Sequence, residues 1–333
     1  MWTLNSGRPT QCLKIGGRAL AWGESSRTWR GRHRYRCVLS PIPQGVIKVS
    51  PIDANVINPT ALEERLRALV GPPKELRRLL GRTWLSELPR RVTLVLPDLA
   101  VRSTVLRLEQ VPARREEQEA LIRWRLGQEQ RLPLTGAKLH WQIFPPRHSH
   151  HDAHTVLVIA VQESILAEYE AACESAGLLP QEVTVASFRL FDLWLKAAGG
   201  TRCLNRDLAW ITVSDGGMTC LIIHDARPVF VRTKLLGGDP ASADDLGNQE
   251  SLGRILRETE LSILTCQEHV PDLQLAQLVL MTESDLPGLE DQLGQALGVA
   301  TDQLLWEHVQ SVGWAHEGGN RSLALLPAVA GLM

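Results

Sequence analysis

The sequence predicts an α/β protein made of two similar halves that close around a cleft. A chain of 333 residues is too long for one ordinary hydrophobic core. Each half also shows several short strands in a row, followed by helices and further strands, and this repetition indicates a duplicated fold. We therefore expect a first lobe over residues 1–200 and a second lobe over residues 201–333.

The first half is predicted to begin with three short strands and then to alternate helices with strands. Leu62, Leu66 and Leu69 recur at helical spacing after Asn58-Pro59, and short apolar runs mark buried strands. The expected strands are 12–22, 33–40, 44–51, 92–96, 100–109, 138–144, 154–161 and 182–186, and the expected helices are 60–71, 114–130, 163–178 and 187–200.

The second half is predicted to repeat this order from about Asp207 onward. Three apolar strands come first, and Gly237-Gly238 precede a long amphipathic helix. The expected strands are 208–214, 218–225, 228–236 and 273–281, and the expected helices are 241–269 and 286–297.

Composition indicates a cytosolic globular protein. Six cysteines lie far apart without a C-x-x-C pair, as is typical of reduced thiols. No apolar run approaches the roughly 20 residues that a membrane-spanning helix needs. The first residues also lack the apolar core of a secretory signal.

Charge is unevenly spread along the chain. Residues 1–40 hold eight Arg or Lys residues against Glu24 alone, whereas residues 239–310 hold fourteen Asp or Glu residues against two arginines. A solvated strand face explains the basic run, and an anionic partner is the alternative. Head-to-tail self-association through the two ends is a further hypothesis, and we expect no nucleic-acid binding. The alternating arginines of the basic strand are Arg30, Arg32, Arg34 and Arg36.

A cluster of imidazoles between two predicted strands is expected to be a solvated hairpin tip. Side chains at such spacing could alternatively bind Zn²⁺ or Ni²⁺. Neither G-x-S-x-G nor H-E-x-x-H occurs in the sequence, so we expect no catalytic residues of those types and no metal centre. The cluster comprises His148, His150, His151, Asp152 and His154.

The stretch WITVSDGGMTC, residues 210–220, joins two apolar strands through Ser214, Asp215, Gly216 and Gly217. The backbone amides of such a turn can cradle a phosphate group. The same glycines also suit a plain strand reversal that binds nothing. The residues alone leave both interpretations open.

Several motifs in the middle of the chain resemble those of a known family. Leu96-Pro97-Asp98 ends a predicted strand, Ile122-Arg123-Trp124 lies on a helix, and Leu132-Pro133-Leu134 follows that helix. The likeness continues through residues 156–193 and through PVFVRTKLLGG at 228–238. Over roughly residues 45–298 the sequence resembles PilM, the cytoplasmic actin-like protein of type IV pilus assembly.

The resemblance implies an actin/Hsp70-like, duplicated two-lobe fold. It also implies a strand–helix–strand–strand insert at about residues 98–162 of the first lobe, similar to the insert of PilM and of the division protein FtsA. In this family ATP lies between the lobes. The glycines and the threonine that match its nucleotide-binding turns are Gly16, Gly17, Gly216, Gly217, Thr219, Gly237 and Gly238.

Three nucleotide motifs of the family are altered here. Lys14 replaces the acidic residue of the first phosphate loop, and Ser214 replaces that of the second. Asp215 comes one residue late, so we expect its side chain on the opposite side of an extended chain. Thr282 to Asp285 replace the Gly-Gly turn that faces adenosine. We therefore expect a degenerate site with no cofactor, although ATP with Mg²⁺ stays open if the site still binds.

In the family, a groove between the insert and the first lobe receives the cytoplasmic N-terminal peptide of PilN, a bitopic membrane protein. The resemblance therefore implies a peptide-binding groove, and packing of an ordinary amphipathic helix on the insert's sheet is the other interpretation of this region. The residues that match the motif positions are Leu96, Pro97, Arg123, Trp124 and Pro133.

Together these features predict a non-catalytic scaffold of a type IV pilus or related secretion machine. It would lie in the cytoplasm, held at the inner membrane by a PilN-like tail, and could contact other proteins of the pilus machine. One alternative is an ATP-binding switch or weak ATPase in which a shifted turn lets Asp215 reach the metal. Another is a component of a type II secretion platform, a class that usually continues into a membrane span.

Overall fold

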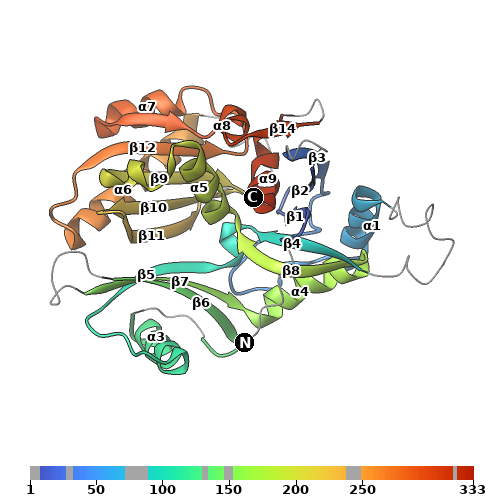
Figure 1. The fold of residues 1–333 in the computed structure, drawn as a ribbon, viewed down its shortest axis with the longest axis horizontal. Helices are drawn as coiled ribbons and strands as arrows, with labels where there is room; N and C mark the ends of the chain where they lie inside the picture. Colours follow the sequence, from blue (N-terminus) through green and yellow to red (C-terminus); the bar gives the residue numbers. More distant parts are fainter. Residues whose placement is uncertain are drawn as a thin grey trace.

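The computed structural model describes residues 8–27, 33–71, 89–129, 134–145, 153–237, 249–317 and 321–333. Over these ranges the chain forms two larger sheets and a small third sheet, with helices between and around them (Figure 1). None of the helices in these ranges is long and apolar enough to cross a membrane.

The first sheet has the strand order β14-β3-β2-β1-β4-β8, in which β14 is the short strand Trp314–His316. Strands β1, β2 and β3 form an antiparallel meander. Strand β4 pairs with β1 in parallel, and β8 pairs with β4 in parallel. Helices α1 and α4 pack on one face, where Leu62 and Leu66 of α1 and Leu166 and Tyr169 of α4 are buried. The elements are β1 (Gln11–Ile15), β2 (Ala19–Arg27), β3 (His33–Pro41), α1 (Pro59–Val70), β4 (Arg90–Leu96), α4 (Glu163–Ser175) and β8 (Leu178–Val185).

Two of the first three predicted strands are corrected by the structure. Residues 12–22 form two strands instead of one, because the chain reverses at Gly16-Gly17, where the Gly16 amide donates to the Ala19 carbonyl. Residues 44–51 form a loop that folds back on itself, with a single bridge between Ile47 and Val56. Gly45 lies in the left-handed region at φ 77°, which interrupts an extended chain there.

The strand–helix–strand–strand insert is confirmed. It consists of β5 (Arg102–Leu108), α3 (Arg115–Glu129), β6 (Ala137–Phe144) and β7 (His154–Gln162), with sheet order β5-β7-β6. Ile122 and Leu126 of α3 pack on Leu106, Val156 and Val158 of the sheet in a small separate core. In Figure 1 the insert lies below the second sheet, where β5 and β7 contact its strand β11 (Arg227–Leu235).

The second sheet has the strand order β11-β10-β9-β12-β13. Helices α6 and α7 cover one of its faces. The predicted helix over 241–269 is described from Gln249 onward, and residues 241–248 lie outside the described ranges. The elements are β9 (Asp207–Ser214), β10 (Gly217–His224), β11 (Arg227–Leu235), α6 (Gln249–His269), β12 (Leu275–Thr282), α7 (Leu289–Leu297) and β13 (Ala300–Gln303).

After β13 the chain returns to the first sheet. Helix α8 (Trp306–Ser311) leads to β14 (Trp314–His316), which adds to β3 in parallel. The last helix, α9 (Leu326–Leu332), is buried and packs against β1, β2, β4 and α5 (Ala186–Ala197). Helices α8 and α9 and strand β14 were not predicted from the sequence. Their course puts these C-terminal residues on the first-lobe sheet, whereas the division at residues 200 and 201 stays a prediction.

Helices α5 and α9 form a layer between the two larger sheets, so one hydrophobic core spans both lobes. Trp194 of α5 and Trp210 of β9 lie in this core with ring centroids 6.0 Å apart. Gly331 of α9 lies so close to β1 that a Cβ atom there would overlap the Cys12 Sγ atom. The glycine therefore allows the helix to sit directly on the sheet.

We expect Gly331→Val to lower the free energy of unfolding by about 1–3 kcal/mol, because the added side chain overpacks the contact with Cys12. Urea unfolding measures the change. Gly253→Ala is the matched control, since a Cβ atom at that position of α6 meets no other atom within 4 Å. This control should be neutral or stabilising by about 0.5–1 kcal/mol. Equal unfolding midpoints for wild type and Gly331→Val would contradict the packing assigned to α9.

Candidate functional site

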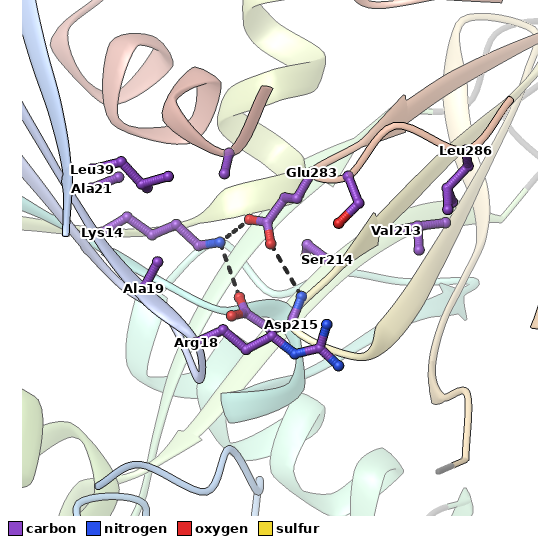
Figure 2. A pocket seen from close by; sticks show the side chains of 12 residues that line it. Lys14, Arg18, Ala19, Ala21, Leu39, Val213, Ser214, Asp215, Glu283 and Leu286 are labelled. Atoms are coloured by element: carbon purple, nitrogen blue, oxygen red, sulfur yellow. Dashed lines mark hydrogen bonds and ion pairs between the residues drawn. The ribbon is translucent and has the colours of Figure 1, made fainter. Parts of the chain in front are cut away.

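Three turns from the two lobes meet at the cleft. The first is the β1–β2 turn at Gly16-Gly17, and the second is the β9–β10 turn at Asp215-Gly216. The third follows β12, which runs parallel to β9 and pairs Thr282 with Val213, so that Glu283 comes directly beside the second turn. Short polar segments of both lobes thus surround one small space (Figure 2).

A buried ion triad joins these turns. The Lys14 Nζ atom lies 3.0 Å from the Asp215 Oδ2 atom and donates a hydrogen bond to the Glu283 Oε1 atom. The Gly17 amide donates to Asp215 Oδ1 at 2.8 Å, and the Asp215 amide donates to Glu283 Oε2 at 3.2 Å. Lys14 is only 3% exposed. Figure 2 shows its side chain reaching from the first-lobe sheet to both carboxylates.

The pKa shifts follow from this charge arrangement. Burial alone would lower the pKa of Lys14, but the carboxylates of Asp215 and Glu283 outweigh it and raise that pKa above its usual value. Burial raises the pKa of Glu283 to about 7, against the attraction of Lys14. Burial also raises the pKa of Asp98 to about 6, although its carboxylate accepts the Ser187 amide at the start of α5. The Lys14 ammonium group thus lowers the pKa of both Glu283 and Asp98, against the effect of burial.

The glycines of both phosphate-loop turns accommodate side chains from the opposite lobe. A Cβ atom on Gly16 would lie 2.5 Å from the Asp215 Oδ1 atom. A Cβ atom on Gly217 would lie 2.8 Å from Leu99, which belongs to the short 3-10 helix η2 (Asp98–Ala100) after β4. Glycine is therefore required at both positions by packing between the lobes.

The prediction that Asp215 points to the opposite side of the chain was wrong. Asp215 has φ 51°, in the left-handed region, so the side-chain alternation of the extended strand β9 ends at Ser214. Asp215 and Ser214 consequently line the same cavity as Lys14. The acidic group that was expected to point away from the cleft therefore contacts Lys14, as Glu283 also does.

The remaining residues predicted for the nucleotide site have other contacts. The Thr219 hydroxyl lies 3.1 Å from the Thr233 hydroxyl within the second sheet. The Gly216 carbonyl accepts the Leu236 amide, and Gly237 lies beside Arg254. Gly238 lies outside the described residues, as do four members of the histidine cluster, namely His148, His150, His151 and Asp152. Within the described ranges, His, Cys, Asp and Glu side chains do not gather in a set that could hold a metal ion.

In this arrangement the cleft residues do not fit a magnesium–nucleotide complex. The cavity between the turns has a volume of about 110 Å³, whereas ordinary ligand sites begin at roughly 300 Å³. The amides of Gly17 and Asp215 already donate to carboxylates of the protein. Asp215 and Glu283, the carboxylates nearest to the turns, are both bound to the Lys14 ammonium group.

A larger groove lies between the insert and the first lobe, with a volume of about 730 Å³. One wall is the face of β6 and β7 that points away from α3, and the opposite wall is formed by β8 and α5. The second lobe closes the groove with Leu221 and Ile223 of β10 and with Ala226 and Pro228, which follow β10. Most lining side chains are apolar, so the groove suits an apolar ligand or segment.

Of the described residues that were predicted for a partner groove, Leu96 alone lines this groove. Pro97 precedes η2, and Arg123 binds Glu119 and the Leu134 and Ala137 carbonyls within the insert. Trp124 is 58% exposed on α3, which lies on the other face of the insert's sheet. Pro133 lies outside the described residues.

Sequence reasoning missed the strand residues that line the groove. Every second residue of β6 lines it, as does every second residue of β7 from Leu157 onward. Leu139, Trp141 and Ile143 of β6 pack on the core of the insert. Because side chains alternate along a strand, the residues between them could have been predicted to form a second, partly polar face. The groove-lining residues of these two strands are Lys138, His140, Gln142, Phe144, Leu157, Ile159 and Val161, together with Leu139, which also packs on the core of the insert.

Comparison with known proteins supports this architecture. No family model matches the sequence, and no curated protein matches it. Among solved structures, a PilM–PilN type IV pilus biogenesis complex is similar at a TM-score of 0.67 and 20% identity, covering 97% of this chain and 98% of that one. The chain therefore has the actin-like fold. It has this fold in its PilM-like form, with the insert in the first lobe.

Two further structures are more distant. An actin-like ATPase-fold protein from Bacteroides thetaiotaomicron has a TM-score of 0.48 at 10% identity, covering 94% of this chain and 98% of that one. The cytoplasmic domain of EpsL, an inner-membrane component of the type II secretion system of Vibrio cholerae, has a TM-score of 0.42 at 10% identity, covering 96% of this chain and 93% of that one.

The titration of Glu283 yields a test of the triad. Because the pKa of Glu283 is raised to about 7, the folded protein keeps a proton there that the unfolded chain loses near its ordinary value of 4.5. Stability should therefore fall as the pH rises from about 5 to about 7, by on the order of 2 kcal/mol relative to Glu283→Gln, which cannot titrate. Urea unfolding over this pH range measures the difference. Parallel pH profiles of the two proteins would contradict the assigned environment.

Proposed function

We propose that the protein is a non-catalytic, PilM-like scaffold of a type IV pilus or related secretion machine, which binds the cytoplasmic N-terminal tail of a PilN-like inner-membrane protein. The groove between the insert and the first lobe is the observation that carries this proposal. The similarity to a PilM–PilN complex supports the choice of partner. The protein would then lie in the cytoplasm, at the inner membrane through that partner.

The groove suits an extended peptide with apolar side chains. Strands β6 and β8 border it, and each is the last described strand of its sheet, so each has an open edge in the described part of the chain. A peptide backbone can pair with such an edge while alternate side chains enter the apolar lining. Arg189 lines the groove together with Glu182 and Asp192, and it forms ion pairs with both of them. The charged groups there thus partly compensate one another.

The cleft supports the non-catalytic part of the proposal. Phosphoryl transfer in this class of fold needs acidic groups that hold Mg²⁺ and orient water. Here Lys14 stands at the first of these positions, and Asp215 and Glu283 are bound to its ammonium group. An ATP-binding switch stays the alternative, and it would require these ion pairs to break before a metal could bind.

We expect the N-terminal cytoplasmic peptide of the PilN-like protein of the same organism to bind, as measured by isothermal titration calorimetry. Val183→Glu should weaken binding at least ten-fold, or about 1.4 kcal/mol, because it introduces a charge into the apolar groove. Leu179→Glu is the matched control. Leu179 lies on the same strand, is 43% exposed against 38% for Val183, and does not line the groove.

One further variant and a nucleotide titration complete the experiment. Trp124→Ala should leave peptide affinity unchanged, because Trp124 lies on α3 outside the groove. If Trp124→Ala instead abolishes binding and Val183→Glu does not, the peptide binds elsewhere on the insert. Binding of Mg-ATP at a ten-fold excess over its Kd would raise the free energy of unfolding by about 1.4 kcal/mol. Such stabilisation in a thermal-shift assay would favour the switch.

A further inference from the structure

The ion triad joins the two lobes through residues far apart in the sequence. Lys14 comes from β1 of the first sheet, whereas Asp215 and Glu283 follow β9 and β12 of the second sheet. Each carboxylate is held by a second contact, from the Gly17 amide to Asp215 and from the Asp215 amide to Glu283. The ammonium group thus lies at the centre of a network that includes both lobes (Figure 2).

We propose that Lys14 is an internal cation that holds the interlobe cleft closed without a metal–nucleotide complex, and that it thereby keeps the second-lobe wall of the groove in place. The first part concerns the cleft and does not depend on a partner. The second part rests on the proposed peptide-binding function. Lys14 acts in it as a positioning residue, since it does not line the groove.

The electrostatics favour closure by Lys14 itself. Two carboxylates in one water-poor space repel each other unless a cation lies between them. In a nucleotide-binding cleft a divalent metal ion can supply that positive charge. Here the Lys14 ammonium group lies between the carboxylates and is covalently part of the first lobe. Closure therefore needs no cation from solution.

Strand β10 connects the cleft to the groove. It begins at Gly217, which packs on Leu99 of the first lobe, and its later residues Leu221 and Ile223 line the groove. Eight residues of an extended strand span about 26 Å at roughly 3.3 Å per residue. A hydrogen-bonded strand in the middle of a sheet is rigid, so opening of the β9–β10 turn at the cleft should move the groove wall as well.

Hydrogen exchange of single amides tests the cleft. Gly17 and Asp215 each donate their amide to a carboxylate of the triad. In Lys14→Met, a side chain of similar length without charge, both amides should exchange at least ten-fold faster than in wild type. Asp215→Asn is the second variant, because it removes the ion pair while it keeps an acceptor for the Gly17 amide. In Asp215→Asn the backbone amide of residue 215 should also exchange faster than in wild type. This variant still tests the proposal if Lys14→Met does not fold.

Glu119→Gln is the matched control, because it removes an ion pair with Arg123 in the insert, away from the cleft. Its exchange at Gly17 and Asp215 should equal that of wild type. Unchanged exchange at both amides in Lys14→Met and Asp215→Asn would overturn the proposal. Slower exchange of the same amides in wild type on addition of Mg-ATP would also overturn it, since the cleft would then close on a ligand.

The peptide titration separates this inference from the proposed function. If wild type binds the PilN-like peptide, Lys14→Met should bind it at least three-fold more weakly although the lining residues are unchanged. Faster exchange at the cleft with unchanged peptide affinity would overturn the link to the groove and leave closure by Lys14 standing. If wild type itself binds no peptide, the proposed function fails, and the exchange data still decide whether Lys14 holds the cleft.

Discussion

The relative position of the two lobes depends on one buried ammonium group between two carboxylates. Lys14 and Asp215 are buried and the Glu283 side chain is only 15% exposed, so the opposite charges stabilise one another where little water reaches them. Such an arrangement favours one discrete closed geometry over a range of partly open ones, because separation by a few ångströms would leave charges buried and unpaired. The layer of α5 and α9 then completes a core shared by both lobes.

Glycine-rich turns are ambiguous indicators of phosphate binding, and this cleft shows the physical reason. A glycine leaves space above the backbone, which can be filled by a ligand or by another part of the protein. At Gly16 the space is filled by the Asp215 carboxylate, and at Gly217 by Leu99. The glycines alone therefore do not distinguish a nucleotide site from a packed interface. The residues that face them across the cleft decide between the two.

The sequence predicted the periodic elements well because their signals are local. Helices α1, α3, α4 and α5 and the order of β9 to β12 follow from apolar spacing within each segment, whereas the grouping of one set of strands and a helix as an insert came from the resemblance to PilM. The separation of β1 from β2 was missed because a glycine pair within an apolar run reads equally well as part of a strand. The return of β14 and α9 to the first sheet was also missed, since no local pattern tells which sheet a short segment joins.

The candidate site was predicted only in part, for the same reason. The resemblance to PilM indicated that Lys14 and Ser214 replace the acidic residues of two phosphate loops, and this prediction needed only the sequence of each turn. The sequence could not place Lys14 against Glu283, because 269 residues separate them along the chain. It also misplaced Asp215, because the strand periodicity was carried one residue too far into a turn with positive φ.

The charge at position 14 determines what the cleft requires from its surroundings. With an acidic residue there, three carboxyl groups would meet at the turns, and a divalent cation would be needed to compensate them. With Lys14, one positive charge meets two negative ones, and the remaining negative charge is reduced when Glu283 takes up a proton near neutral pH. A single residue type thus converts a cleft that requires an external cation into one that carries its own. Because β10 runs from this cleft to the groove, Lys14 would also position the groove wall that is proposed to bind a partner.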